Sequence, residues 1–263
     1  MLTIEKYKIC SFKNKNHQIF MKSFHPYGEE ALLINFEQAI KETIHQQVIA
    51  LKTAIEAAQL PSVSFLIPAY CSLTVGYNPE ELDYETLCVL IKNLETGATT
   101  AINNQTRKLT IPVCYDEEFG LDLKELSTDK QLSIQEIIKL HTTTLFRVYM
   151  LGFLPGFTYM GKLPESLVCS RKTSPRLRVP ALSVGLAGYQ TGIYPSEAPG
   201  GWQIIGRTPI PIFDTRKEHP FLCQAGDQVQ FEAISKKAFY KISKKVEARK
   251  FNWKQIGCEG KIK

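Results

Sequence analysis

The sequence lacks a long uninterrupted apolar run, although 44% of its 263 residues are hydrophobic. Arg147 interrupts the longest candidate, around residues 145–157, which falls short of the ~18 apolar residues that a membrane-spanning helix needs. The first residues carry several charges and no apolar core, so they do not resemble a secretory signal. These absences predict a cytoplasmic protein with no membrane partner.

Paired cysteine motifs are also missing. The seven cysteines are scattered along the chain, and none forms a Cys-x-x-Cys or Cys/His pair at zinc spacing. Several lie in apolar strings, such as Cys88, where a buried thiol behaves as a small hydrophobic group. The pattern predicts reduced cysteines and neither a metal site nor an organic cofactor in this chain.

Common catalytic and nucleotide-binding motifs are absent or incomplete. The chain has no G-x-S-x-G and no H-E-x-x-H string. Residues 156–162 match the start of a phosphate loop, G-x-x-x-x-G-K, but Leu163 stands where a hydroxyl would hold magnesium, and Pro164 opposes an immediate helix. We therefore expect no nucleotide-binding loop here.

The positive charge is concentrated at one end. Residues 236–263 hold ten Lys or Arg and two acids, which leaves 22 of the 32 bases and 24 of the 26 acids for the rest of the chain. A nearly neutral body with a basic, solvated C-terminal extension over 241–263 is the favoured interpretation. A nucleic-acid partner is not expected, because no basic surface interleaved with aromatics is evident.

The first part of the chain predicts a small α+β domain over residues 1–97. Short apolar strings indicate strands, and apolar residues at three- and four-residue steps indicate amphipathic helices. The expected strands are 31–36, 62–67 and 73–77, and the expected helices are 36–55 and 84–94. The polar stretch 95–108 is typical of a linker.

Residues 98–240 predict a second domain rich in short strands. Ser133 and Glu136 form a capping-box pattern before an apolar helix, and residues 145–151 alternate so that Arg147 and Tyr149 share one face. Glycine and proline punctuate 152–214, and residues 228–233 alternate again. Many short strands with few helices favour a closed or nearly closed β-barrel.

Two polar side chains in this domain have competing interpretations. Arg147 lies within an apolar string, so it needs an anionic partner, either a bound carboxylate or phosphate or an acid of the chain itself. His141 ends the predicted helix, where it interacts with the helix dipole or acts as an acid/base. The structural role is slightly favoured for His141.

Three strings in this region resemble the 5-oxoprolinase B-subunit family, also called the Kip-inhibitor or allophanate hydrolase subunit 1 family. They are GFLPGFTYMGKLPE, SPRLRVPALSVGLAGYQTGIYP and APGGWQIIGRTPIPIFD, and the resemblance covers roughly residues 20–235. Lys162 and Leu182 stand where glycines are expected, and the basic segment after 236 lies beyond the family's usual end.

The resemblance implies a small α+β N-terminal domain followed by a cyclophilin-like β-barrel. It also implies a hydrolase component, inactive alone, that works with A-type and C-type subunits to open the lactam of 5-oxo-L-proline to L-glutamate, using ATP. For that chemistry the candidate catalytic residues are His141, Arg147 and Gln190. The candidate substrate-binding residues are Tyr149, Phe153, Tyr159, Arg176, Arg178, Thr191, Tyr194 and Trp202.

Two other functions stay open within the same resemblance. Relatives in urea metabolism use the fold in carboxyl transfer, which would require a separate biotin protein because this chain has no A-M-K-M string. Another relative inhibits a sensor histidine kinase, a role that needs no polar pocket. A shared fold does not choose among these functions.

Overall fold

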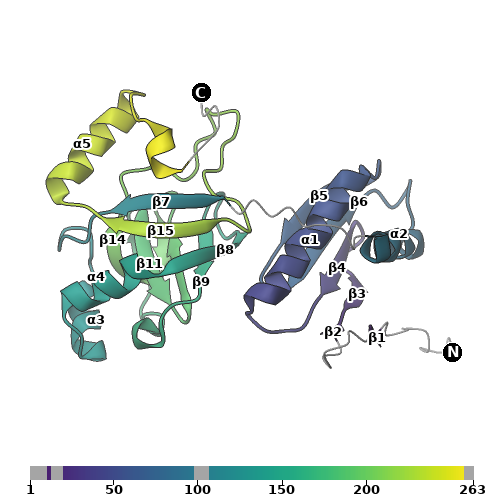
Figure 1. Cartoon of the computed structure of the whole chain (residues 1–263), viewed down its shortest axis with the longest axis horizontal. Coiled ribbons are helices and arrows are strands. Elements are labelled where there is room, and N and C mark those ends of the chain that lie inside the picture. The colour runs from purple at the N-terminus through teal and green to yellow at the C-terminus, as the bar shows by residue number, and fades with distance from the viewer. Residues whose placement is uncertain (1–10, 13–19, 98–106, 258–263) are drawn as a thin grey trace. The chain divides into compact units, whose positions relative to one another are not determined.

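The computed structural model describes residues 11–12, 20–97 and 107–257, and the chain divides into two compact units, Met1–Asn104 and Gln105–Lys263 (Figure 1). Most of the predicted linker, 95–108, lies outside the described residues. None of the described helices is both long enough and apolar enough to span a bilayer. Each unit has its own hydrophobic core and is described separately below.

The first unit is a four-stranded antiparallel sheet with two helices. The strand order is β3 (Ser23–Pro26), β4 (Ala31–Asn35), β6 (Ser72–Tyr77) and β5 (Val63–Pro68), and a short pair, β1 (Ser11–Phe12) and β2 (Phe20–Met21), precedes them. Helices α1 (Glu42–Ala58) and α2 (Tyr84–Gly97) pack with the sheet around one core. The predicted strands and helices are confirmed, except that α1 begins at Glu42 rather than Phe36.

The second unit is built on a curled seven-stranded sheet. Its strand order is β14 (Gln203–Arg207), β11 (Ser183–Ala187), β12 (Gln190–Ile193), β9 (Thr158–Gly161), β8 (Leu145–Leu151), β15 (Gln228–Ala233) and β7 (Lys108–Val113). The pair β15–β7 is parallel, whereas the other pairs are antiparallel. The structure confirms an α+β fold with a curled, half-barrel sheet.

The two edge strands of this sheet meet at one bridge. Cys114, directly after β7, and Arg207, at the end of β14, exchange both backbone hydrogen bonds, at 2.9 and 3.0 Å. The face that the sheet curls around is filled by alternate residues such as Phe146, Val148 and Met160, and we call it the inner face. The opposite, outer face carries a smaller aromatic cluster beside the two-stranded ribbon β10 (Arg176–Val179) and β13 (Ala198–Gly200).

Short helices complete this unit. Helix α3 (Leu123–Lys130) precedes α4 (Ile134–Thr143), and η1 (Glu165–Leu167) follows β9. The predicted capping box is present, because the Ser133 hydroxyl accepts from the Glu136 N–H while the Glu136 carboxylate accepts from the Ser133 N–H. β9 occupies the interior of the string 156–162, so this string is a strand and not a phosphate loop, as expected.

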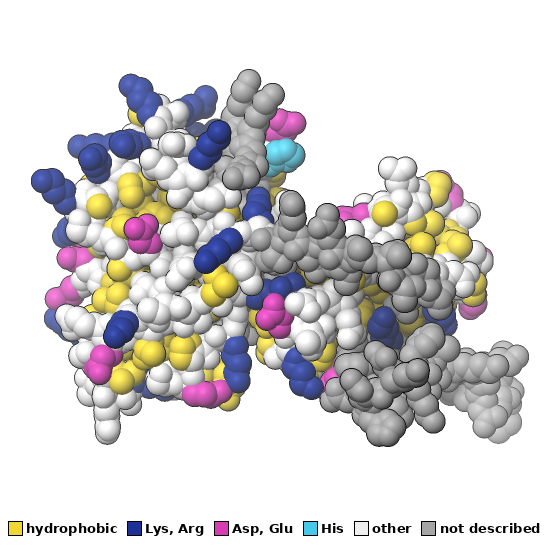
Figure 2. All heavy atoms as spheres, in the orientation of Figure 1, with side chains coloured by type: hydrophobic (Ala, Val, Ile, Leu, Met, Phe, Trp, Pro, Cys, Tyr) yellow, Lys and Arg dark blue, Asp and Glu magenta, His cyan; other side chains and the backbone are white. Residues whose placement is uncertain are grey.

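The C-terminal segment is not the solvated extension that the sequence predicts. Helix α5 (Lys236–Glu247) begins at a Ser235 cap, and η2 (Trp253–Ile256) follows. Ile256 belongs to the inner core, and Ile242, Phe251 and Trp253 pack against it. The charge pattern hid this packing, because lysines separate the apolar residues. The lysines themselves are exposed, and Figure 2 shows basic side chains gathered over α5.

Candidate functional site

The predicted site residues divide between the two faces of the curled sheet. On β8, Phe146 and Val148 belong to the inner core, so the intervening Arg147 projects from the outer face. On β12, Thr191 is buried on the inner side, so Gln190 projects outward. Since the sheet itself separates the two groups, the structure does not bring Arg147, Gln190 and His141 into a single site.

Arg147 and Gln190 share one row across three adjacent strands. The Cα partner of Arg147 in β9 is Gly161, and the partner of Gly161 in β12 is Gln190. Residues opposite one another in a sheet present their side chains on the same face. Arg147 and Gln190 therefore lie on the same face, on either side of Gly161 in β9. We call Arg147, Gly161 and Gln190 the outer row.

Gly161 gives the outer row its shape. A Cβ atom at this position would lie 3.3 Å from Cε2 of Tyr149 and 3.6 Å from the carbonyl oxygen of Tyr189. The missing side chain therefore lets the Tyr149 ring lie against the backbone between Arg147 and Gln190. Sequence analysis missed Gly161 as a site residue, since a glycine-rich region offers no signal for one particular glycine. Arg147 and Tyr149 are largely buried, and Gln190 is half-buried.

Aromatic residues extend the outer face beyond this row. Phe157 contacts Tyr159, Tyr194 and Trp202, with ring centroids 4.7, 5.0 and 5.3 Å away. Burial raises the pKa of Tyr194 to about 12, so its hydroxyl stays protonated at neutral pH. Phe153 reaches the same cluster through the Phe157 ring but is exposed. The cluster brings four predicted residues together, as a packed wall rather than an open pocket.

His141 lies inside the curled sheet. Its Nδ1 is 2.8 Å from the Tyr115 hydroxyl and its Nε2 is 3.0 Å from the Thr191 hydroxyl, and its ring stacks on Phe231. Burial lowers the pKa of His141 to about 3, so the ring is neutral at physiological pH. Both ring nitrogens are occupied by protein partners. This environment fits the structural role, with Thr191 and Tyr115 as its partners, and Tyr115 is a residue that the sequence did not single out.

Arg176 is committed to a structural carboxylate. Both of its terminal nitrogens donate to Asp122, at 2.6 and 2.8 Å, and Asp122 also accepts from Lys172 and from the Ile204 N–H. Burial alone would raise the pKa of Asp122, but these donors outweigh it and hold that pKa below its ordinary value. The prediction that Arg176 grips a substrate is corrected: its guanidinium ties ribbon β10–β13 to the start of α3.

The remaining predictions concern exposed or special backbone positions. The Arg178 side chain is 83% exposed, and its Nε lies 3.8 Å from a carboxylate oxygen of Glu197. Leu182, where a glycine is expected, has a φ of 65°, in the left-handed region that favours glycine. Among the described residues, no group of three His, Cys, Asp or Glu side chains could hold a metal ion.

The matches with known proteins extend across both units. A family model described as "Carboxyltransferase domain, subdomain C and D" matches residues 22–223. The chain is 39% identical to the B subunit of 5-oxoprolinase from Bacillus subtilis, covering 81% of this chain and 93% of that protein. It is 38% identical to the protein of that name from Escherichia coli O157:H7, covering 78% of this chain and 92% of the relative.

Solved structures with related sequences share the fold. A crystal structure of TTHA0988 superposes with a TM-score of 0.70 at 36% identity, and the match covers 78% of this chain but only 40% of that one. The chain thus spans about two fifths of the length of that protein. The Kluyveromyces lactis urea amidolyase superposes with a TM-score of 0.74 at 17% identity, a likeness of fold alone.

Proposed function

Because the chain belongs to the 5-oxoprolinase B-subunit family, we propose that it is one component of an ATP-dependent 5-oxoprolinase, a complex that opens the lactam of 5-oxo-L-proline to L-glutamate. Its partners are then an A-type and a C-type protein of the same complex. The complex uses the ATP, since the one phosphate-loop-like string of this chain is a strand. The curled sheet of the second unit fits the cyclophilin-like barrel that this family implies.

The outer row is the observation that carries the proposal. Arg147 and Gln190 are separated by two interstrand spacings, or about 10 Å between Cα atoms. A guanidinium binds a carboxylate with two parallel hydrogen bonds, and a primary amide both donates to a carbonyl and accepts from an N–H. Long side chains at the two ends of such a span suit a small molecule with a carboxylate on one side and a cyclic amide on the other.

The chemistry assigns a different task to each side chain. A lactam carbonyl is stabilised by resonance, so its oxygen must be activated, with ATP as the phosphoryl donor, before water attacks. Arg147 holds the substrate carboxylate, and Gln190 hydrogen-bonds the amide as charge develops on it. We assign no proton transfer to His141, because burial lowers its pKa to about 3 and both ring nitrogens have protein hydrogen-bond partners. The proton is then moved by water or by a group on the partner proteins.

Reconstitution tests this assignment. The purified chain alone is expected neither to hydrolyse ATP nor to open 5-oxoproline, whereas the chain mixed with the A-type and C-type proteins of its own organism is expected to do both. Coupled ADP release and glutamate formation measure the two halves of the reaction. Turnover by the lone chain, or a complete mixture that stays inactive, contradicts the proposal.

A carboxyl-transfer role is the second candidate, favoured by the description of the matching family model. A segment of 74 residues is also 39% identical to urea amidolyase of Lachancea kluyveri. This segment covers 4% of that protein. Calorimetry of the reconstituted complex with urea and with 5-oxoproline separates the two functions. If the complex binds urea and does not bind 5-oxoproline, this result would favour carboxyl transfer and count against the lactam substrate.

A further inference from the structure

The outer row continues beyond Arg147 onto β15 and β7. The Cα partner of Arg147 in β15 is Gln228, and the partner of Gln228 in β7 is Lys108. Val229, the next residue of β15, belongs to the inner core, so Gln228 projects from the outer face as Arg147 does. Gln228 is therefore the direct cross-strand neighbour of Arg147, on the side opposite Gln190.

The side-chain amide of Gln228 is available to a ligand. Gln228 is half-buried, and no other described residue forms a hydrogen bond with its side chain. Gln230 lies two positions along the same strand and on the same face, but its Nε2 donates to the Thr142 carbonyl at 3.2 Å. A primary amide both donates and accepts hydrogen bonds, and polar groups withdrawn from water are normally paired. Of the two glutamines, Gln228 is thus the one whose amide can bind a substrate.

The two ends of the row differ in charge. Lys108 is exposed at one end, and its ammonium has no ion pair with another described residue. At the other end, the partner of Gln190 in β11 is Ala187, which carries no charge. A carboxylate is therefore favoured on the Gln228 side of Arg147, and a neutral cyclic amide on the Gln190 side.

The acid next to Gln228 does not oppose a bound carboxylate. Asp227 is largely buried, and its carboxylate accepts hydrogen bonds from Nε and Nη2 of Arg107, at 3.1 and 2.5 Å. The same carboxylate accepts from the Gln224 N–H at 2.7 Å. Its negative charge is thus compensated within the segments that lead into β7 and β15.

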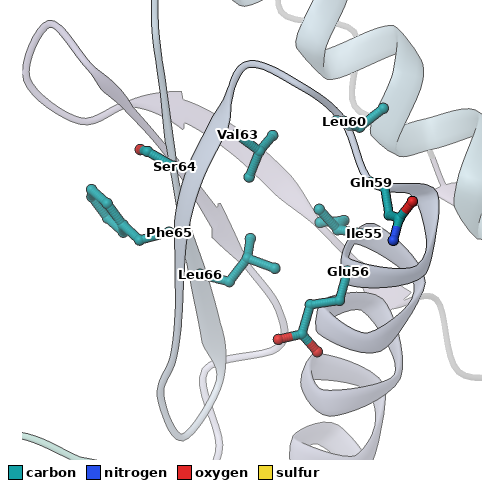
Figure 3. Close-up of a pocket in the computed structure, with 8 residues that line it drawn as sticks. All are labelled: Ile55, Glu56, Gln59, Leu60, Val63, Ser64, Phe65 and Leu66. Carbon is teal, nitrogen blue, oxygen red and sulfur yellow. The ribbon is translucent and has the colours of Figure 1, made fainter.

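Two hollows elsewhere in the described part of the chain suit a small carboxylate less well. One lies beside α1 and β5 in the first unit, measures about 240 Å³, and is lined mainly by apolar side chains (Figure 3). Its charged side chain is acidic, because Glu56 lies at the rim and pairs with Lys52. The other lies beside the start of α5, where the Lys236 ammonium is paired with Glu118. Neither hollow offers a free cation to an anionic ligand.

We propose that Gln228 binds the substrate carboxylate together with Arg147, and thereby helps to select lactams that carry a carboxylate. This inference rests on the proposed function, in which Arg147 holds that group. A guanidinium occupies part of a carboxylate with two parallel hydrogen bonds, and further lone pairs on both oxygens stay open. Cross-strand neighbours have Cβ atoms about 4.5–5.5 Å apart, so the Gln228 amide N–H reaches one of these lone pairs.

Kinetics of the reconstituted complex test this contact. Gln228→Leu removes the amide and is expected to raise KM for 5-oxo-L-proline about tenfold or more, as for a lost hydrogen bond to a charged group. The value of kcat should change less than about twofold, because a contact remote from the reacting carbonyl is made equally before and during the reaction. Gln230→Leu is the matched control, with the same substitution on the same strand and face. It should leave KM within about twofold of the wild-type value.

Gln228→Glu separates substrate binding from a structural role. Glutamate has nearly the shape of glutamine but places a negative charge beside the substrate carboxylate, so KM should rise further than it does with Gln228→Leu. A side chain that only supported the fold would be replaced better by glutamate than by leucine, which gives the opposite order. The two variants are compared at one ionic strength, since salt screens exposed charges.

Three results would overturn the role of Gln228: an unchanged KM in Gln228→Leu, an equal rise in Gln230→Leu, or a smaller rise in Gln228→Glu than in Gln228→Leu. Thermal melting adds a fourth, because the Gln228 amide has no partner to lose and both of its variants should melt with the wild-type chain. If the wild-type complex does not open 5-oxoproline at all, the proposed function fails instead. A wild-type complex that is active, with variants that bind equally well, rejects the role of Gln228 alone.

Discussion

At the scale of single residues, His141 and Arg147 are only six positions apart in sequence, yet one lies in the core and the other lies in the candidate site. Helix α4 ends two residues after His141, and the chain then enters β8, where alternation sends Phe146 inward and Arg147 outward. His141 has polar partners on both ring nitrogens within an apolar core. Arg147 lies at one end of a row with Gly161 and Gln190. The two residues therefore predict different experimental behaviour.

Arg147→Lys tests the proposed substrate contact. A lysine keeps the charge but loses the paired geometry of the guanidinium. Loss of a charged hydrogen bond costs ~1.5–3 kcal/mol, so activity of the reconstituted complex should fall at least tenfold while the melting temperature stays nearly unchanged. Arg216→Lys, at an exposed ion pair with Asp214, is the matched control and should keep its activity. A variant of Arg147 that melts early, or that keeps full activity, removes this residue from the site.

The low pKa of His141 predicts a specific pH dependence of stability. An unfolded histidine binds a proton near pH 6.5, but the folded one does so only near pH 3. The unfolded state thus binds more protons between these values, so the free energy of unfolding falls as the pH drops through this window, by up to about 1.4 kcal/mol per pH unit.

Denaturant titrations of the wild-type chain and of His141→Asn between pH 7 and pH 4.5 measure this slope. The asparagine variant is expected to be less stable at neutral pH but to lose less stability on acidification. Asp122 does not interfere, because its pKa is below its ordinary value and its contribution is lost only at lower pH. Equal slopes for the two proteins would show that His141 is protonated in the folded state.

At the scale of elements, a buried carboxylate fastens one ribbon to the rest of the second unit. Asp122, just before α3, accepts hydrogen bonds from Arg176 on β10, from Lys172 and from the backbone of Ile204 on β14. Its side chain is 1% exposed. Three segments that are far apart in sequence therefore depend on one charged group.

Arg176→Met is expected to destabilise the second unit by about 3 kcal/mol, because breaking a buried ion pair leaves the carboxylate poorly compensated. The remaining contact from Lys172 places the effect at the lower end of the usual range. Arg178→Met, two residues along the same strand and largely exposed, is the matched control and should change stability by less than about 0.5 kcal/mol. Equal losses of stability for the two variants in urea titrations would mean that the ion pair between Arg176 and Asp122 does not stabilise the second unit.

The elements that the sequence predicts well are those with local signals. The Ser133–Glu136 capping box, the periodic apolar face of α1 and the alternation of β15 all depend on residues a few positions apart, whereas the alternation expected along β8 is broken by a register shift between Val148 and Met150. The exceptions have local causes as well. Helix α1 begins at Glu42, later than its apolar periodicity indicates, and the lysines of α5 conceal an apolar side that packs.

The candidate site is less predictable because long-range pairing creates it. Arg147 and Gln190 were identifiable as unusual residues, yet their alignment through Gly161 depends on the register of three strands. His141 and Arg176 carry the side chains of catalytic residues, but Thr191 and Asp122, each some fifty positions away in sequence, give them structural partners. No local pattern reveals such partners.

At the scale of the whole molecule, the C-terminal segment is part of the second unit. Ile256 is 4% exposed and belongs to the same core as Leu109 and Val229. Ile256→Ala should therefore lower the free energy of unfolding by about 2–4 kcal/mol, the usual cost of emptying such a site. Lys254→Ala, exposed and two residues away, should change it by less than about 0.5 kcal/mol. If chemical denaturation shows that both changes lower the free energy of unfolding by less than about 0.5 kcal/mol, the segment is a solvated extension.

The bridge between Cys114 and Arg207 has a consequence for folding during synthesis. Strand β7 is the first strand of its sheet to be synthesised, yet its neighbours are β15, the last, and β14, which precedes β15. A nascent chain on the ribosome therefore holds β7 without a partner while most of the other strands are translated. Contacts of this kind form late and leave apolar surface open to chaperones and to neighbouring chains. The sheet can close only when β15 has emerged.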